Sequence, residues 1–143
     1  MWRQPWQLLG EVRLLSFFDG IGSAALALES LGMQLKTFLA WEVDEECNHL
    51  TKHHFPKVQH RGDFAKDDPR AVADLLNGDQ TLVVITAGPP CPDFSRIRGP
   101  DAPGKAGPEG QKFTAFCKFI NELRGLLRCP NTILVENVVF QQP

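Results

Sequence analysis

The chain has 143 residues, which suits a single domain with a buried core. Hydrophobic residues make up 43% of the sequence and charged residues 22%, the composition of an ordinary globular protein. The formal net charge of −2 excludes a strongly basic nucleic-acid-binding protein, so any contacts with phosphate groups must be local. The apolar runs are far shorter than the roughly 20 residues of a membrane-spanning helix, and we expect no membrane partner.

The first half of the chain predicts three strands and two helices in alternation, as in an α/β protein with a parallel sheet. A strand at 12–18 leads through a glycine-rich turn into a helix at 23–31. A second strand at 35–42 precedes a helix at 44–54, and a short third strand is predicted at 57–60.

The second half continues the alternation. A helix at 68–77 begins with a capping aspartate followed by proline at the first helical position. The apolar, β-branched run at 81–87 predicts a strand that is buried on both faces of the sheet. Residues 88–110 are rich in glycine and proline and predict a long loop, after which we expect a helix at 112–128 and a strand at 132–135.

The cysteines and histidines do not indicate a metal centre. The four cysteines form no Cys-x-x-Cys pair, which argues against a zinc clamp or a thioredoxin-like motif and favours free thiols in a reduced protein. His49 and His53 are four residues apart, a spacing that can bind zinc on a helix. A solvated helix face is the interpretation that we favour, and we expect no metal.

The turn after the first strand has the sequence FDGIG at 18–22. Its two glycines let the backbone approach a ligand, and the following helix offers free N–H groups to a carboxylate or phosphate. This fragment is shorter than the full dinucleotide fingerprint, and a plain tight turn is the alternative. Glu42 comes about 20 residues later at the end of the second strand, where nucleotide-binding α/β folds hold ribose hydroxyls. The turn and Glu42 together predict an adenosine-containing cofactor.

Asp63 follows the third strand, and ligands of parallel sheets gather at the carboxyl ends of the strands. Its carboxylate could accept a hydrogen bond from an adenine amino group. A helix cap or a turn aspartate is the alternative for this residue.

Cys91 follows the fourth strand in the run GPPCPDFSR at 88–96. A structural cysteine usually lies within an element and is inert. Cys91 instead lies in a proline-stiffened turn before a long loop, and such loops in compact domains are usually functional. Fixed prolines also help a nucleophile to aim. We therefore predict that Cys91 is a nucleophile.

Glu136 directly follows the fifth strand, which we expect to lie beside the fourth strand and so to bring this carboxyl group close to Cys91. A negative charge beside a thiol opposes thiolate formation, so Glu136 is a poor activator of the cysteine. A carboxyl group that donates a hydrogen bond to a ring nitrogen of a substrate base fits the pattern better.

Together these residues resemble the cytosine-C5 DNA methyltransferase family. The matching segments, in chain order, are FDGIG at 18–22, Glu42, Gly62 with Asp63, GPPC at 88–91 and ENV at 136–138. The resemblance covers about 13–139 and corresponds to the N-terminal half of that family's catalytic domain. It implies a Rossmann-like parallel sheet of the S-adenosylmethionine-dependent methyltransferase type. We expect one partial catalytic domain over 1–143, with five of the strands of the complete sheet.

The resemblance also implies roles for individual residues. S-adenosylmethionine would be the cofactor, held by Phe18, Asp19, Gly20, Gly22, Glu42, Val43, Asp63 and Pro90. Cys91 would attack C6 of a cytosine flipped out of duplex DNA, so that C5 takes the methyl group, and Glu136 would bind N3 and the exocyclic amine. Further substrate contacts are expected from Pro89, Ser95, Arg96, Asn137 and Val138.

The family's catalytic domain continues with a Gln-x-Arg-x-Arg element, a target-recognition region and a C-terminal segment that completes the cofactor pocket. We recognise none of these and expect a fragment or one part of a split enzyme, with weak or no activity alone. Its missing partner would be the C-terminal half or a separate chain. RNA is the alternative substrate, because one branch of the family methylates transfer RNA, and an inactive cofactor- or partner-binding module is the third interpretation. We expect an intracellular protein, nuclear if the source is eukaryotic.

Overall fold

The computed structural model describes residues 10–90, 92 and 103–137. These residues form a parallel five-stranded sheet in the order β3-β2-β1-β4-β5. The strands are β1 Glu11–Phe17, β2 Gln34–Trp41, β3 Gln59–His60, β4 Leu82–Ala87 and β5 Asn131–Val135. The predicted α/β class with a parallel sheet is confirmed.

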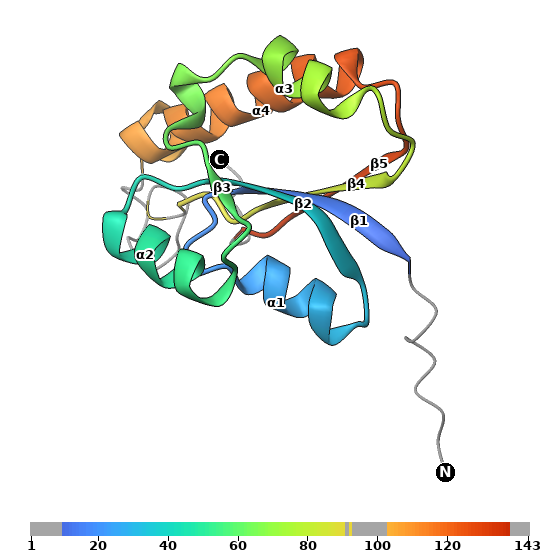
Figure 1. Cartoon of the computed structure of the whole chain (residues 1–143). Coiled ribbons are helices and arrows are strands. Elements are labelled where there is room, and N and C mark those ends of the chain that lie inside the picture. Colours follow the sequence, from blue (N-terminus) through green and yellow to red (C-terminus); the bar gives the residue numbers. More distant parts are fainter. Residues whose placement is uncertain (1–9, 91, 93–102, 138–143) are drawn as a thin grey trace.

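Helices cover the sheet from both sides (Figure 1). The α-helices are α1 Ser23–Ser30, α2 Glu45–His54, α3 Pro69–Leu76 and α4 Pro108–Leu126, with short 3₁₀ helices η2 Phe64–Lys66 and η4 Gly104–Ala106. Helices α1 and α2 lie on one face of the sheet, and α3 and α4 lie on the other. Asp44 caps α2 by accepting from the N–H of Cys47 at 2.9 Å, and Asp68 caps α3 by accepting from the N–H of Arg70 at 3.0 Å.

Two predicted starting points are wrong by two residues or more. The third strand was predicted from residue 57 but forms only at Gln59–His60. Helix α4 begins at Pro108 rather than at 112, because proline is well suited to the first helical position, and η4 precedes it. The loop predicted over 88–110 is therefore interrupted by helical structure near its end.

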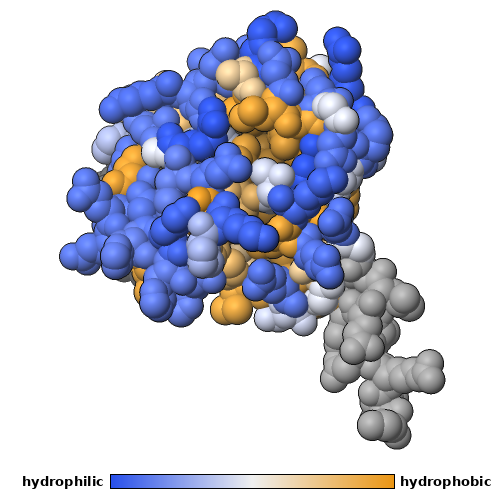
Figure 2. All heavy atoms as spheres, in the orientation of Figure 1, coloured by the Kyte–Doolittle hydropathy of each residue, from blue (hydrophilic) through white to orange (hydrophobic). Residues whose placement is uncertain are grey.

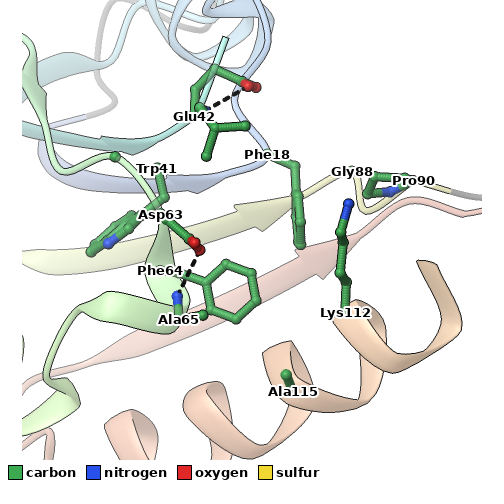
Figure 3. A pocket seen from close by; sticks show the side chains of 12 residues that line it. Phe18, Trp41, Glu42, Asp63, Phe64, Ala65, Gly88, Pro90, Lys112 and Ala115 are labelled. Atoms are coloured by element: carbon green, nitrogen blue, oxygen red, sulfur yellow. Dashed lines mark hydrogen bonds between the residues drawn. The ribbon is translucent and has the colours of Figure 1, made fainter. Parts of the chain in front are cut away.

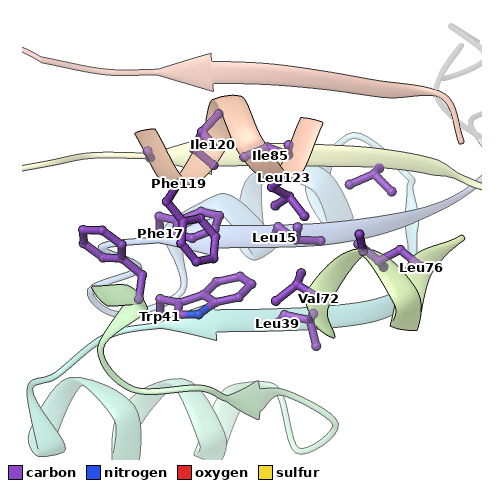
Figure 4. Packing of buried hydrophobic residues seen from close by; sticks show 14 of the residues in the cluster. Leu15, Phe17, Leu39, Trp41, Val72, Leu76, Ile85, Phe119, Ile120 and Leu123 are labelled. Atoms are coloured by element: carbon purple, nitrogen blue, oxygen red, sulfur yellow. The ribbon is translucent and has the colours of Figure 1, made fainter. Parts of the chain in front are cut away.

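The larger hydrophobic core lies between the sheet and the layer of α3 and α4 (Figure 4). Phe17 stacks on Trp41 at its centre, with ring centroids 4.1 Å apart. Phe116 and Phe119 of α4 meet Phe17 edge to face. A smaller cluster beneath the sheet joins Leu14 and its neighbours to α1.

Strand β4 is not buried on both faces, contrary to the prediction. Val83 and Ile85 are fully buried against the α3 and α4 layer, whereas Val84 and Thr86 on the opposite face are only half-buried. On β5, the Leu134 residue is 68% exposed. The physical reason is that α1 and α2 lie under the half of the sheet that holds β1, β2 and β3. The described helices therefore leave this face of β4 and β5 open.

The surface is mostly hydrophilic on the side shown in Figure 2, with hydrophobic atoms exposed through the middle of this face. No helix among the described residues is long and apolar enough to cross a membrane.

The amino end of the sheet is closed by Arg13, which is 2% exposed. Its guanidinium donates to the backbone carbonyls of Leu76, Asp79 and Thr81. These bonds satisfy carbonyls at the C-terminal end of α3 and in the connection to β4. Space for a ligand is found at the opposite end of the strands.

Candidate active site

The carboxyl ends of the four longer strands lie side by side. The strand register pairs Phe17 with both Trp41 and Ala87, and Ala87 with Val135. The residues that follow the strands are therefore neighbours at one edge of the sheet, as expected for a ligand site in an open parallel sheet.

The turn after β1 depends on left-handed backbone conformations. Phe18, Gly20 and Gly22 have φ angles of 54°, 60° and 81°. A Cβ at Gly22 would lie 3.1 Å from Phe55 and 3.2 Å from Thr51, so glycine is needed for the close approach of α2. Phe18 adopts its φ at some conformational cost, and its ring packs edge to face on Phe64.

Glu42 ties this turn to the end of β2. Its Oε2 accepts from the N–H of Gly20 at 2.9 Å, and its Oε1 accepts from the N–H groups of Val43 at 2.8 Å and Asp44 at 3.0 Å. A carboxylate has about four acceptor positions, so Glu42 can still accept from a ligand hydroxyl.

Asp19 is buried beside the same turn, with 8% of its surface exposed. Thr51 donates a long hydrogen bond of 3.5 Å to its Oδ2, and its Oδ1 has no partner among the described residues. Burial, together with the nearby charge of Glu42, raises the pKa of Asp19 to about 6, although hydrogen bonding with Ser16 and Thr51 acts to lower this pKa.

A cavity of about 460 Å³ opens between the ends of β2 and β3 and helix α4 (Figure 3). We call it the β2–β3 cavity; its lining residues are Phe18, Trp41, Glu42, Val43, Gly62, Asp63, Phe64, Ala65, Gly88, Pro90, Lys112 and Ala115. Its volume lies in the range of about 300–1,000 Å³ that is usual for small-molecule pockets.

Five of the predicted cofactor residues meet in this cavity: Phe18, Glu42, Val43, Asp63 and Pro90. Sequence reasoning missed the contributions of Trp41, Phe64, Lys112 and Ala115. Trp41 carried a signal, because it directly precedes Glu42 at the end of a strand. The α4 residues carried none, because their approach depends on how the helix packs.

Asp63 has the capping role that was the alternative for it, and its predicted contact with an adenine amino group stays a prediction. Its Oδ1 caps η2 by accepting from the N–H of Ala65 at 2.9 Å. The same side chain lines the β2–β3 cavity, where Oδ2 can accept from a ligand.

A second hollow of about 440 Å³, the β4–β5 cavity, lies under the open face of the sheet. It shares Phe18 and Gly88 with the β2–β3 cavity, so these two residues stand between the two spaces. Asp19 and Glu136 line it with a largely apolar surface from α1, β4 and β5, which includes Leu28, Leu31, Val84 and Leu134.

Glu136 lies beside the start of the GPPC run. Its backbone N–H donates to the carbonyl of Ala87 at 2.9 Å, and a Cβ placed on Gly88 would be 3.9 Å from its Oε2. Pro89 is buried and Asn137 is half-buried. Cys91, Ser95, Arg96 and Val138 lie outside the described residues, so their predicted roles stay predictions.

The far end of the long loop is packed tightly onto α4. A Cβ on Gly110 would overlap the carbonyl oxygen of Gly104 and lie 2.7 Å from the Cα of Lys105. No other residue type fits at Gly110 without moving η4 away from the helix.

Over the described ranges, no three His, Cys, Asp or Glu side chains group to hold a metal ion. His53 and His54 contact each other at the end of α2, with ring centroids 5.3 Å apart.

Comparison with known proteins decides the family. Residues 12–140 match the model of the family described as C-5 cytosine-specific DNA methylase. The chain belongs to this family. Enzymes of the family transfer a methyl group to C5 of cytosine and use S-adenosylmethionine as the methyl donor.

A similar solved structure is that of a mutant of DNMT2 from Spodoptera frugiperda. The two folds superpose with a TM-score of 0.62 at 21% sequence identity. The match covers 88% of this chain but only 35% of that chain, so the chain spans about a third of the length of that structure.

The residues of the β2–β3 cavity fit S-adenosylmethionine. Glu42 has remaining acceptor capacity for ribose hydroxyls, Asp63 presents an oxygen for an amino group, and Phe18 offers an aromatic face. The cofactor of the family and the donor and acceptor set of the cavity therefore agree.

Proposed function

We propose that this chain is the cofactor-binding part of an enzyme that methylates C5 of cytosine in DNA through a covalent adduct on Cys91. The observation that carries the proposal is that Glu136 lies beside Gly88 where the two cavities meet. A base-recognising carboxyl group and a cofactor pocket thus share one edge of the sheet.

In the proposal, Glu42 accepts from the ribose hydroxyls and Asp63 accepts from the adenine amino group. Val43 and Pro90 pack on the adenosine, and Phe18, Asp19, Gly20 and Gly22 shape the pocket around the rest of the cofactor. The bound cofactor supplies an electrophilic methyl group on its sulfonium. The pocket's task is to fix that methyl group next to C5 of the base.

Cys91 adds as a thiolate to C6 of the cytosine, which makes C5 nucleophilic. Glu136 donates a hydrogen bond to N3 and accepts one from the exocyclic amine, so it stabilises the charge that builds on the ring. After transfer, loss of the C5 proton expels the Cys91 thiolate and leaves 5-methylcytosine. Pro89, Asn137 and Val138 would border the base, and Ser95 and Arg96 would contact the flanking backbone.

The base must leave the duplex to reach this site, because C6 is not accessible to a thiol inside the stack. The open β4–β5 cavity and the exposed Leu134 support a further proposal, that another segment or a partner chain covers this face in the working enzyme. The chain's length relative to the DNMT2 structure agrees with that proposal.

Covalent trapping tests the proposed function. The chain is incubated with S-adenosylmethionine and a DNA duplex containing 5-fluorocytosine, which prevents loss of the proton at C5 and so retains the adduct. We expect a small yield of adduct on Cys91, in keeping with weak activity of the chain alone, that survives denaturing electrophoresis and disappears in Cys91→Ser. Cys129→Ser is the matched control, because Cys129 is buried in the core and should not affect the adduct.

The substrates in the same experiment separate the alternatives. An adduct with a fluorinated RNA hairpin and none with duplex DNA would replace DNA by RNA as the substrate. Binding of S-adenosylhomocysteine without any adduct would support the inactive module and contradict catalysis by this chain.

A further inference from the structure

An ion pair between Arg61 and Asp67 lies against the β2–β3 cavity and has no role in the function proposed so far. Arg61 Nε donates to Asp67 Oδ2 at 2.6 Å, and Arg61 Nη2 donates to Oδ1 at 2.8 Å. The two side chains are 23% and 11% exposed. This bidentate, largely buried geometry distinguishes the pair from the exposed ion pairs that contribute little.

The Asp67 carboxylate has further donors. The indole Nε1 of Trp41 donates to Oδ2 at 2.8 Å, and the backbone N–H of Asp68 donates to Oδ1 at 2.9 Å. The Arg61 guanidinium also lies 5.8 Å from the centroid of the Trp41 ring, within the range of a cation–π contact. Burial acts to raise the pKa of Asp67, but the bonds from Arg61 and Trp41 outweigh it and hold the pKa below its ordinary value.

These contacts join three pieces of the fold at one point. Trp41 ends β2, Arg61 directly follows β3, and Asp67 precedes the cap of α3. We call Arg61, Asp67 and Trp41 the clamp. It closes a short turn, 62–66, whose two ends are held by the bidentate pair.

The clamped turn carries a large part of the cavity wall. Gly62, Asp63, Phe64 and Ala65 all line the β2–β3 cavity. Within the turn, the Asp63 carboxylate is held by the N–H of Ala65, and the carbonyl of Asp63 accepts from the N–H of Lys66 at 3.0 Å. Since these bonds lie inside the turn, the turn's place against the rest of the wall depends on its two ends and on Phe64, which is buried and packs edge to face on Phe17 and Phe18. Asp63 lies between Phe64 and the end that Arg61 holds.

We propose that the clamp is a positioning device for base recognition in the cofactor pocket. By fixing both ends of the 62–66 turn, Arg61 and Asp67 hold the Asp63 carboxylate where it distinguishes the amino group of adenine from the carbonyl of hypoxanthine. The clamp touches no ligand itself and acts through Asp63. This inference rests on the proposed function, because it takes the cavity to hold an adenosine.

The test compares two ligands that differ at one group. S-adenosylhomocysteine and its deaminated form, S-inosylhomocysteine, are titrated calorimetrically into the 143-residue chain. A fixed acceptor opposite a carbonyl is left unpaired, so we expect the adenine form to bind on the order of tenfold more tightly. Asp63→Asn sets the reference for a pocket that has lost this preference.

Two variants loosen the clamp. Asp67→Asn keeps the size of the side chain but removes the charge, and Arg61→Lys keeps the charge but removes the planar fork. Each variant should bind S-adenosylhomocysteine no more than about twofold more tightly than S-inosylhomocysteine. The preference for ribose over 2′-deoxyribose, measured with 2′-deoxy S-adenosylhomocysteine, should stay as in the unsubstituted chain, because Glu42 is held by a different turn.

Lys36→Gln is the matched control. It breaks an ion pair of 2.8 Å with Asp79 away from the β2–β3 cavity and should leave both preferences unchanged. If circular dichroism shows that Asp67→Asn does not fold, Arg61→Lys decides the test.

Different outcomes would overturn the clamp's positioning role alone or the proposed function as well. Clamp variants that bind both ligands more weakly but keep the tenfold preference for the adenine form would overturn the positioning role and leave the proposed function intact. No binding of S-adenosylhomocysteine by the unsubstituted chain, or binding that is indifferent to Glu42→Gln, would overturn the proposed function and the clamp's role with it.

Discussion

The two cavities differ in how far the described chain completes them. The β2–β3 cavity has walls from the ends of four strands and from α4, and its carboxylates are held by hydrogen bonds from the turns around them. The β4–β5 cavity has an apolar floor and an open side, with Leu134 68% exposed at its edge. The β2–β3 cavity, which we propose holds the cofactor, is largely enclosed by the described residues, whereas the β4–β5 cavity, which we propose receives the base, has an open side.

This difference indicates that cofactor binding and base recognition, the two halves of the reaction, can respond differently in the isolated chain. Cofactor binding depends on short-range turns, so it should survive in the isolated chain. Base recognition, in the proposed function, depends on Glu136 beside a half-open surface, so it should be sensitive to what covers that surface. The following changes test whether the halves separate in this way.

The largest effect is expected from Glu136→Gln on the base side. The variant keeps the size of the side chain but removes the carboxyl group, and adduct formation with fluorocytosine DNA should slow on the order of 10³-fold. The affinity for S-adenosylhomocysteine should stay within about twofold, measured by calorimetry. Equal losses in adduct formation and cofactor affinity would show that the two halves are not separable.

The next effect concerns Asp19, which lies at the boundary of the two halves. Its pKa rises from an ordinary 3.8 to about 6 on folding, so the folded state binds more protons between these values and stability falls as the pH rises through this window. Asp19→Asn should remove this loss. The free energy of unfolding of Asp19→Asn minus that of the unsubstituted chain should rise by about 2 to 3 kcal/mol from pH 4 to pH 7, measured by urea unfolding. A difference that does not change with pH would contradict the raised pKa.

A smaller effect is expected from Glu42→Gln on the cofactor side. The variant retains one acceptor oxygen but loses the charge that holds three N–H groups, so cofactor affinity should fall about tenfold. The loss should shrink for 2′-deoxy S-adenosylhomocysteine, which lacks one of the hydroxyls. Asp44→Asn, which changes only the exposed cap of α2, is the control and should leave the affinity unchanged.

The smallest effect is expected from Leu134→Gln on the open face. Because Leu134 is already exposed, the free energy of unfolding should change by less than about 0.5 kcal/mol. Ile85→Ala on the covered face should lower the free energy of unfolding by about 2 to 5 kcal/mol. Thermal unfolding measures both variants. A large loss at Leu134 would mean that this face is already covered in solution.

The parts of the site that sequence could predict are local. The capping aspartates, the glycines of the FDGIG turn and the strand ends depend on neighbours in the chain, so Glu42, Asp63 and Glu136 were placed at the correct edge of the sheet. The wall from Lys112 and Ala115 was missed, because it depends on the packing of a helix that is distant in sequence.

The covering of β4 and the clamp show the same limit. The apolar run at 82–87 indicates a strand but not which faces are covered, since that depends on where α1 and α2 lie. The pairing of Arg61 with Asp67 depends on the conformation of the turn between them, and the six-residue spacing alone does not predict a bidentate contact.

The contact between Gly110 and η4 has a consequence for how this protein tolerates variation. A mutational scan should show Gly110 as a position where even alanine is rejected, because a methyl group would overlap the backbone of Gly104. Gly78 and Gly125, which have open space around them, should accept many residue types. The junction of the long loop with α4 at Gly110 should then vary little among related sequences, whereas the nearby helix surface should vary freely.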